Sequence, residues 1–142
     1  LGNRALTLNE LPESLRHFER VVAIQPENAA ALNNLAWLKG QLGRDGALAD
    51  AERANALAPN QPAFMDTWAM LLSSANQHER ALEMQKKVVQ LQPQVLEFKL
   101  NLAKIQIKAG NKDAARALLD ELSAAGDRFS AQAEVDRLKK TL

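Results

Sequence analysis

Histidines and paired carboxylates are the side chains of this sequence that could do acid-base or metal chemistry. His17 and His78 lie far apart in the chain, and neither belongs to an HExxH motif or to a catalytic triad. The pair Asp120-Glu121 falls in a helical pattern, where a solvated face is a simpler interpretation than a glycosidase acid pair. The sequence has no cysteine, and its six glycines form no phosphate-binding motif. We therefore expect no catalytic, cofactor-binding or metal-binding residues, and a protein that is not an enzyme.

The composition is that of a soluble, helix-rich protein. The 142 residues are 46% hydrophobic and 25% charged, and Ala and Leu dominate, which favours helices packed through small residues. The net charge of +1 removes the attraction expected of a general nucleic-acid binder. No segment approaches the roughly 20 apolar residues needed to cross a bilayer. We expect neither nucleic-acid binding nor direct membrane insertion by this segment.

Three prolines reveal an internal repeat. Pro26, Pro59 and Pro93 lie 33 and 34 residues apart. The same spacing superposes three pairs of apolar residues, namely Leu35-Ala36, Trp68-Ala69 and Leu102-Ala103. With a gap of one residue in the first turn, it also aligns three small residues, Ala47, Ala81 and Ala115.

The residues between these landmarks predict where helices end. Gly43 and Gly110 suit a left-handed cap after the first helix of a unit, and Asn76 occupies the comparable turn. Asn28 and Asn60 follow prolines and are predicted N-caps. With apolar residues spaced three and four apart, the pattern predicts helices over 10–25, 28–42, 45–58, 61–75, 78–91, 94–109, 111–124 and 129–141.

These residues resemble the tetratricopeptide repeat (TPR) family, whose unit is a helix-turn-helix of about 34 residues. The resemblance implies an all-α fold, a right-handed superhelical solenoid of antiparallel helix pairs. Gly2 falls where the first repeat should have its small residue, so we expect the chain to begin inside a repeat. We divide the single solenoid unit 1–142 into a partial repeat 1–27, repeats 28–60, 61–93 and 94–127, and a capping helix 128–142.

The last segment has the pattern of a cap for the open end of the array. Ala131, Val135, Leu138 and Leu142 make one apolar face, and charged residues lie between them. The Ala-rich repeats and this cap are similar to the C-terminal part of bacterial TPR lipoproteins of exosortase and exopolysaccharide systems. That resemblance implies a periplasmic or outer-membrane-associated protein, with the cytoplasm as the alternative.

The TPR resemblance implies that partners bind in a concave groove lined by the first helices of the repeats. Trp68 aligns with aliphatic residues and is expected in the core, whereas Trp37 aligns with Met70 and Lys104 and is expected in the groove. Amides would pair with a peptide backbone, and Trp and Met would accept an apolar side chain. The groove residues predicted to bind a protein or peptide are Asn33, Asn34, Trp37, Gln41, Asp66, Met70, Ser73, Asn101, Lys104 and Lys108.

Two alternatives stay open. TPR domains that capture a C-terminal carboxylate resemble this chain at Asn34 and Asn101, but Trp37 and Asp66 stand where other clamp residues could lie. The array could also be a structural, self-associating segment of a longer TPR protein in bacterial cell-envelope or exopolysaccharide assembly, forming a homo-oligomer. Residues 1–71 carry six basic and eight acidic side chains and residues 72–142 carry twelve and nine, so an acidic partner would favour the C-terminal half.

Overall fold

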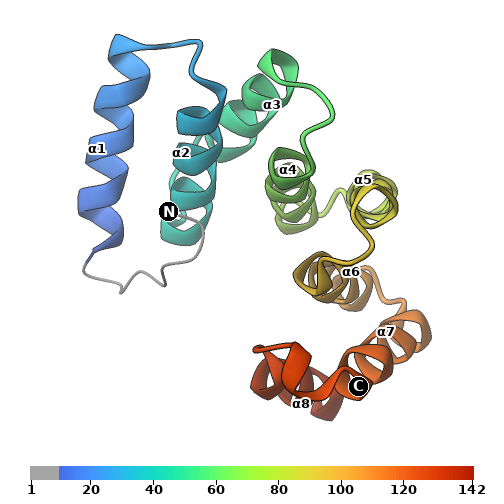
Figure 1. The fold of residues 1–142 in the computed structure, drawn as a ribbon. Helices are drawn as coiled ribbons and strands as arrows, with labels where there is room; N and C mark the ends of the chain where they lie inside the picture. The colour runs from blue at the N-terminus through green and yellow to red at the C-terminus, as the bar shows by residue number, and fades with distance from the viewer. Residues whose placement is uncertain (1–9) are drawn as a thin grey trace. The chain divides into compact units, whose positions relative to one another are not determined.

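The computed structural model describes residues 10–142, which contain α-helices joined by short turns and no strand (Figure 1). The predicted all-α class is confirmed. In chain order the elements are α1 (Leu11–Ile24), α2 (Ala29–Leu42), α3 (Ala47–Leu57), α4 (Pro62–Ser74), α5 (His78–Leu91), α6 (Leu96–Lys108), α7 (Lys112–Ala124), the short 3-10 helix η1 (Gly126–Arg128) and α8 (Gln132–Lys140). None of these helices is both long enough and apolar enough to cross a membrane.

Most of the predicted helix ends are confirmed. The Asn28 side chain accepts a hydrogen bond from the backbone N–H of Ala31 at 3.0 Å, as an N-cap does. Gly43, Gly110 and Asn76 adopt positive φ angles of 66°, 88° and 63°.

The predicted N-cap at Asn60 is wrong. Asn60 has a φ of 64° and lies in the turn, and α4 begins only at Pro62. Proline has no N–H and its ring sets φ near the helical value, so it favours the first position of a helix. The carbonyl of Gln61 accepts a hydrogen bond from the backbone N–H of Met65 at 3.0 Å. Gln61, and not Asn60, is therefore the residue that directly precedes the helix.

The last helix starts later than the predicted residue 129. Residues Gly126–Arg128 form η1, and Phe129 then adopts an extended conformation with φ −124° and ψ 116°. The Phe129 side chain is only 5% exposed and packs into the neighbouring core. Burying this ring delays the start of α8 to Gln132.

The chain divides into two compact units, of which the first ends at Leu71. In this unit α1 lies beside α2, and α2 packs against α3 (Figure 1). Leu11, Leu15 and Phe18 of α1 pack with Ala31, Leu35 and Leu38 of α2. Ala51 and Ala54 of α3 have no exposed surface, which fits close packing through small residues. The first residues, including Gly2, lie outside the described part of the chain.

The second unit runs from Leu72 to Leu142 and contains the end of α4 and helices α5 to α8. Leu100 and Ala103 of α6, Leu119 and Leu122 of α7, and Val135 of α8 belong to one core. Leu138, Leu142 and Ala131 pack against it, so the apolar face foreseen for the last helix does cover this core.

Buried side-chain amides join α3 to α4 and α5 to α6, which in both cases are a second helix and the first helix of the next repeat. Asn55 of α3 is 7% exposed and donates to the carbonyl of Phe64 of α4 at 3.1 Å. Gln85 of α5 is fully buried and donates to the carbonyl of Phe98 of α6 at 3.0 Å. Gln132, at the start of α8, donates in the other direction, to the carbonyl of Leu122 of α7 at 2.7 Å. Each joint therefore fixes the first turn of the incoming helix.

Candidate functional site

Helix α2 presents a tryptophan and polar amides to solvent. Trp37 is 43% exposed, although the neighbouring Leu35 and Leu38 are buried on the other side of the helix. Asn34 precedes Trp37 by three residues and Gln41 follows it by four, so these side chains share its face. Asn34 is half-buried and Gln41 is exposed. This face offers an apolar ring flanked by groups that donate and accept hydrogen bonds.

Asn33 lies on the same helix and is half-buried. Its side-chain oxygen Oδ1 is buried and receives no hydrogen bond from any residue that the structure describes. A buried acceptor of this kind costs free energy unless a water molecule or a partner donates to it.

Helix α4 approaches α2 at a glycine. A Cβ atom built on Gly40 would lie 2.7 Å from Cδ2 of Leu71, closer than side chains pack. Asp66 and Met70, the predicted groove residues of α4 in the first unit, are half-buried. Trp68 is also half-buried, so its ring is less enclosed than the predicted core position implies.

The four predicted groove residues of the second unit differ in how far their side chains are exposed. Ser73 is 3% exposed, so its side chain is not on an open surface. Asn101 and Lys104 are half-buried, and Lys108 is exposed. Only Lys108 therefore presents a largely open side chain.

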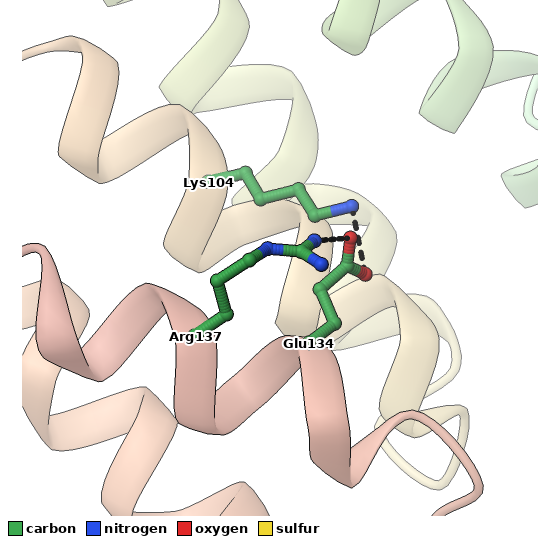
Figure 2. A network of polar contacts seen from close by, with 3 residues as sticks. All are labelled: Lys104, Glu134 and Arg137. Carbon is green, nitrogen blue, oxygen red and sulfur yellow. Dashed lines mark hydrogen bonds and ion pairs between the residues drawn. The ribbon is translucent and has the colours of Figure 1, made fainter.

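Lys104 is held by the last helix (Figure 2). Its Nζ lies 3.1 Å from Oε1 of Glu134 on α8, and Arg137 lies 3.2 Å from Oε2 of the same carboxylate. Both Lys104 and Glu134 have side chains that are 31% exposed. The charge of Lys104, predicted to attract acidic groups of a partner, is thus already opposed by a carboxylate of the chain itself.

Glu134 was not among the residues that sequence reasoning selected. A signal for it exists, because Glu134 follows Asn101 by 33 residues, one repeat further on. The helix treated as a cap thus carries a polar residue at the spacing of the first-helix positions. Lys139 of α8 also pairs with Asp120 of α7 at 2.9 Å, which fixes the helix from its other side.

Residues 10–142 hold no group of three or more histidine or carboxylate side chains that could bind a metal ion. The hollows on residues 10–71 include two shallow ones, one along α1 and one at the turn between α1 and α2. Neither is lined by a predicted groove residue. The arrangement offers chemistry for noncovalent recognition, with an exposed ring, amides and a lysine.

Part of this chain matches a known protein family, and its fold is similar to that of known structures. Residues 72–140 match the family model "Tetratricopeptide repeat". The fold is similar to a solved structure described as "Crystal structure of MamA", with a TM-score of 0.69, 12% sequence identity, and 89% of this chain and 78% of that chain covered. A second structure, "Crystal structure of MamA protein", gives a TM-score of 0.65 at 15% identity, covering 84% of this chain and 68% of that one. No curated protein matches the sequence.

The family match covers residues 72–140, and the two solved structures show that the fold of most of the chain is of the same kind as theirs. The helix-turn-helix repeat inferred from proline spacing agrees with the fold likeness across most of the chain and with the family match over its second half. Folds of this type serve as scaffolds for protein-protein interaction.

Proposed function

We propose that this chain is a non-catalytic protein-protein interaction scaffold, which binds a peptide or partner protein through the first helices of its repeats. The observation that carries the proposal is Trp37, a large aromatic side chain left 43% exposed beside Asn34 and Gln41. Exposed aromatic rings are costly to keep on a surface and are enriched at binding hot spots.

The chemistry of the face suits a peptide. Trp37 would accept an apolar side chain, and the amides of Asn34 and Gln41 would pair with backbone N–H and C=O groups. In the second unit, Asn101 offers a further amide and Lys108 an exposed cation, whereas Ser73 is buried and takes no part in the proposed binding.

Peptides selected from a random library against the wild-type chain test the proposal. Replacing Trp37→Ala together with Asn34→Ala should weaken the best peptide at least about tenfold, because a central anchor and its hydrogen-bonding neighbour are lost. The matched control, Arg44→Ala with Gln61→Ala, changes exposed turn residues and should leave affinity unchanged. Equal affinity of the Trp37 variant and the wild type would contradict the proposal.

The same peptides separate internal-segment binding from capture of a carboxylate terminus. A peptide that is amidated at its C-terminus keeps its side chains but loses the terminal charge. We expect both forms to bind alike, since Trp37 and Asp66 stand where a carboxylate clamp would need other residues. A large loss on amidation would favour the clamp.

The structural alternative is a self-associating segment of a longer repeat protein in bacterial cell-envelope or exopolysaccharide assembly. It is supported by the sequence resemblance to TPR lipoproteins of those systems. Sedimentation over a range of protein concentrations tests it, because self-association is governed by mass action. A monomer at every concentration removes this alternative and leaves peptide binding as the proposed function.

A further inference from the structure

Helix α8 continues the series of first helices beyond the last full repeat. Arg137 of α8 follows Lys104 of α6 by 33 residues, which is one repeat. Lys104 in turn aligns with Met70 and Trp37 of the earlier first helices. Val135 of α8 has no exposed surface and packs in the core formed with α6 and α7, as a further first helix would. Arg137 therefore stands at the repeat position of three predicted groove residues.

A carboxylate lies between these two cations (Figure 2). Nζ of Lys104 is 3.1 Å from Oε1 of Glu134, and Arg137 donates a hydrogen bond to Oε2 at 3.2 Å. Each oxygen thus faces a cation of its own, one from α6 and one from α8. Cationic contacts of this kind favour an ionised oxygen group over a neutral one. The two helices therefore form a carboxylate site, and its occupant in this structure is a side chain of the same chain.

The stability of α8 alone explains only part of this arrangement. Glu134 is in the first turn of α8, where an acidic side chain offsets the helix dipole. Arg137 follows it by three residues, a spacing at which opposite charges pair on one helix. Neither effect involves Lys104, which reaches the same carboxylate from α6. The convergence of cations from two helices is therefore a property of the surface that these helices share.

Helix α8 is held by contacts that do not involve Glu134. Val135 fills the core, Gln132 donates to a backbone carbonyl of α7 at 2.7 Å, and Lys139 lies 2.9 Å from a carboxylate of α7. The Glu134 side chain is 31% exposed, so part of it already contacts water. Rotation about its own bonds can move its carboxylate into water while α8 stays in place. An incoming carboxylate can therefore replace it between the two cations.

The charge around this site favours an acidic partner. Lys108 is exposed one helical turn after Lys104 on α6. Among the residues that the structure describes, Glu134 is the one carboxylate within ion-pair distance of Lys104, Lys108 or Arg137. Residues 72–142 carry twelve basic and nine acidic side chains, which adds a weak attraction over longer range. The cations at this site are therefore not fully balanced by the chain itself.

We propose that Lys104 and Arg137 form a subsite for an acidic side chain of the bound peptide, and that Glu134 competes for this subsite. The inference rests on the proposed function, because it names the chemistry of a peptide bound along the first helices. An Asp or Glu side chain of the peptide takes the place of the Glu134 carboxylate, which turns into water. Helix α8 then has two roles, since it covers the core and its Glu134 lowers the affinity for acidic partners.

A random peptide library displayed on phage tests the inference without a known partner. The library is selected in parallel against the wild-type chain and the Glu134→Gln variant, and the shares of Asp and Glu in the two enriched pools are compared. Glu121→Gln is the matched control. It makes the same change in charge and also releases a lysine of α6, Lys99, but its carboxylate lies on the second helix α7. Circular dichroism checks that each variant is folded.

The pool selected by Glu134→Gln should contain at least about twice the share of acidic residues found in the wild-type pool, because the subsite is open. The Glu121→Gln pool should resemble the wild-type pool. Adding Lys104→Gln and Arg137→Gln to the Glu134→Gln chain should remove the enrichment, because both cations of the subsite are then gone.

Two further measurements separate the subsite from general charge attraction. Adding Lys86→Gln and Lys112→Gln to the Glu134→Gln chain removes two exposed cations of α5 and α7 and should keep the enrichment. Fluorescence anisotropy then compares one enriched acidic peptide with its analogue that carries an amide in place of the acid. The loss of affinity on this change should be about fivefold greater for Glu134→Gln than for the wild type, because no carboxylate of the chain competes.

An equal share of acidic residues in the Glu134→Gln and wild-type pools would overturn the inference, and Glu134 would then only help to anchor α8. An equal rise with Glu121→Gln would also overturn it, because net charge rather than the subsite would explain the result. The proposed function fails in a different way. The variant with Trp37→Ala and Asn34→Ala would then enrich the same peptides as the wild type, whatever the acidic share of the Glu134→Gln pool.

Discussion

The side-chain amide of Gln85 donates a hydrogen bond to the backbone carbonyl of Phe98 at 3.0 Å. One repeat earlier, the carbonyl of Phe64, the residue equivalent to Phe98, accepts from Asn55 instead. The donor has moved by one helical turn along the second helix, and the shorter Asn side chain starts nearer the helix end. The acceptor thus occupies the same position in both repeats, whereas the donor does not. The hydrogen bond between the two helices recurs although neither its donor position nor its donor residue type is conserved between the repeats.

This joint predicts an order of stability for two substitutions at Gln85. Gln85→Met keeps the volume but removes the donor, and we expect it to lower the free energy of unfolding by about 1 kcal/mol. Gln85→Glu keeps the shape but turns a carboxylate toward the Phe98 carbonyl in a fully buried site, which should cost about 3 kcal/mol or more at neutral pH. Urea unfolding measures both.

The control for these variants is Gln90→Glu, on the exposed side of the same helix. It makes the same chemical change in water and should alter stability by less than about 0.5 kcal/mol. If Gln85→Glu were as stable as Gln90→Glu, the hydrogen bond to Phe98 would not be part of the folded protein.

Local features of the fold followed from the sequence because they depend on short-range chemistry. Proline spacing located the repeats, and the N-cap at Asn28 and the left-handed turns at Gly43 and Asn76 were correctly predicted. The N-cap predicted at Asn60 was wrong because Pro62 fixes the start of the helix two residues later, which leaves Asn60 in the turn.

Features that depend on distant contacts did not follow from the sequence. The pairing of Lys104 with Glu134 links residues on α6 and α8, and no local pattern marks it. Ser73 was predicted to line the groove, yet it is buried, since burial is decided by packing rather than by residue type. The exposure of Trp37, by contrast, was foreseen because its aligned residues, Met70 and Lys104, ruled out a common apolar position.

The contact between Gly40 and Leu71 predicts that the effect of Gly40→Ala on stability depends on which residue stands at position 71. Alanine favours a helix over glycine by about 1 kcal/mol, but in the wild type a Cβ at Gly40 would meet Cδ2 of Leu71 at 2.7 Å. Gly40→Ala should therefore bring little or no gain alone. After Leu71→Ala the obstacle is gone, and the same change should stabilise by about 1 kcal/mol.

Urea unfolding of the four proteins in this double-mutant cycle measures the coupling. Additive effects of Gly40→Ala and Leu71→Ala would mean that the two residues do not touch in solution.

The last helix should protect the core of the second unit. Val135 has no exposed surface, and Val135→Asp would place a charge against Leu119 and Leu122, so α8 should detach. Hydrogen exchange should then speed up at the amides of α7. Ala133→Asp introduces the same charge on the exposed side of α8 and should leave exchange unchanged. Slow exchange at α7 in the Val135→Asp variant would contradict the role of α8 as a cap.

The pairing of Glu134 with Lys104 predicts which lysine an acidic partner meets. Glu134 is close to both Lys104 and Arg137, whereas no ion pair within residues 10–142 involves Lys108. If the first helices bind peptides as proposed, Lys108→Gln should weaken an acidic library peptide severalfold, and Lys104→Gln should change little. Glu134→Gln frees the Lys104 charge at a cost in stability of less than about 1 kcal/mol, because the pair is partly exposed.

In the Glu134→Gln background, Lys104 and Lys108 should contribute similarly to binding of the acidic peptide. The acidic peptide should bind more tightly than to the wild type, and Lys104→Gln should now weaken it as Lys108→Gln does, because no carboxylate of the chain competes for Nζ. Titration calorimetry of the peptide against the two single lysine variants, in both backgrounds, gives the coupling directly. If Lys104→Gln weakened binding as strongly with Glu134 present as with it replaced, then Glu134 would not be opposing the partner, and α8 would act on this surface only as a cap.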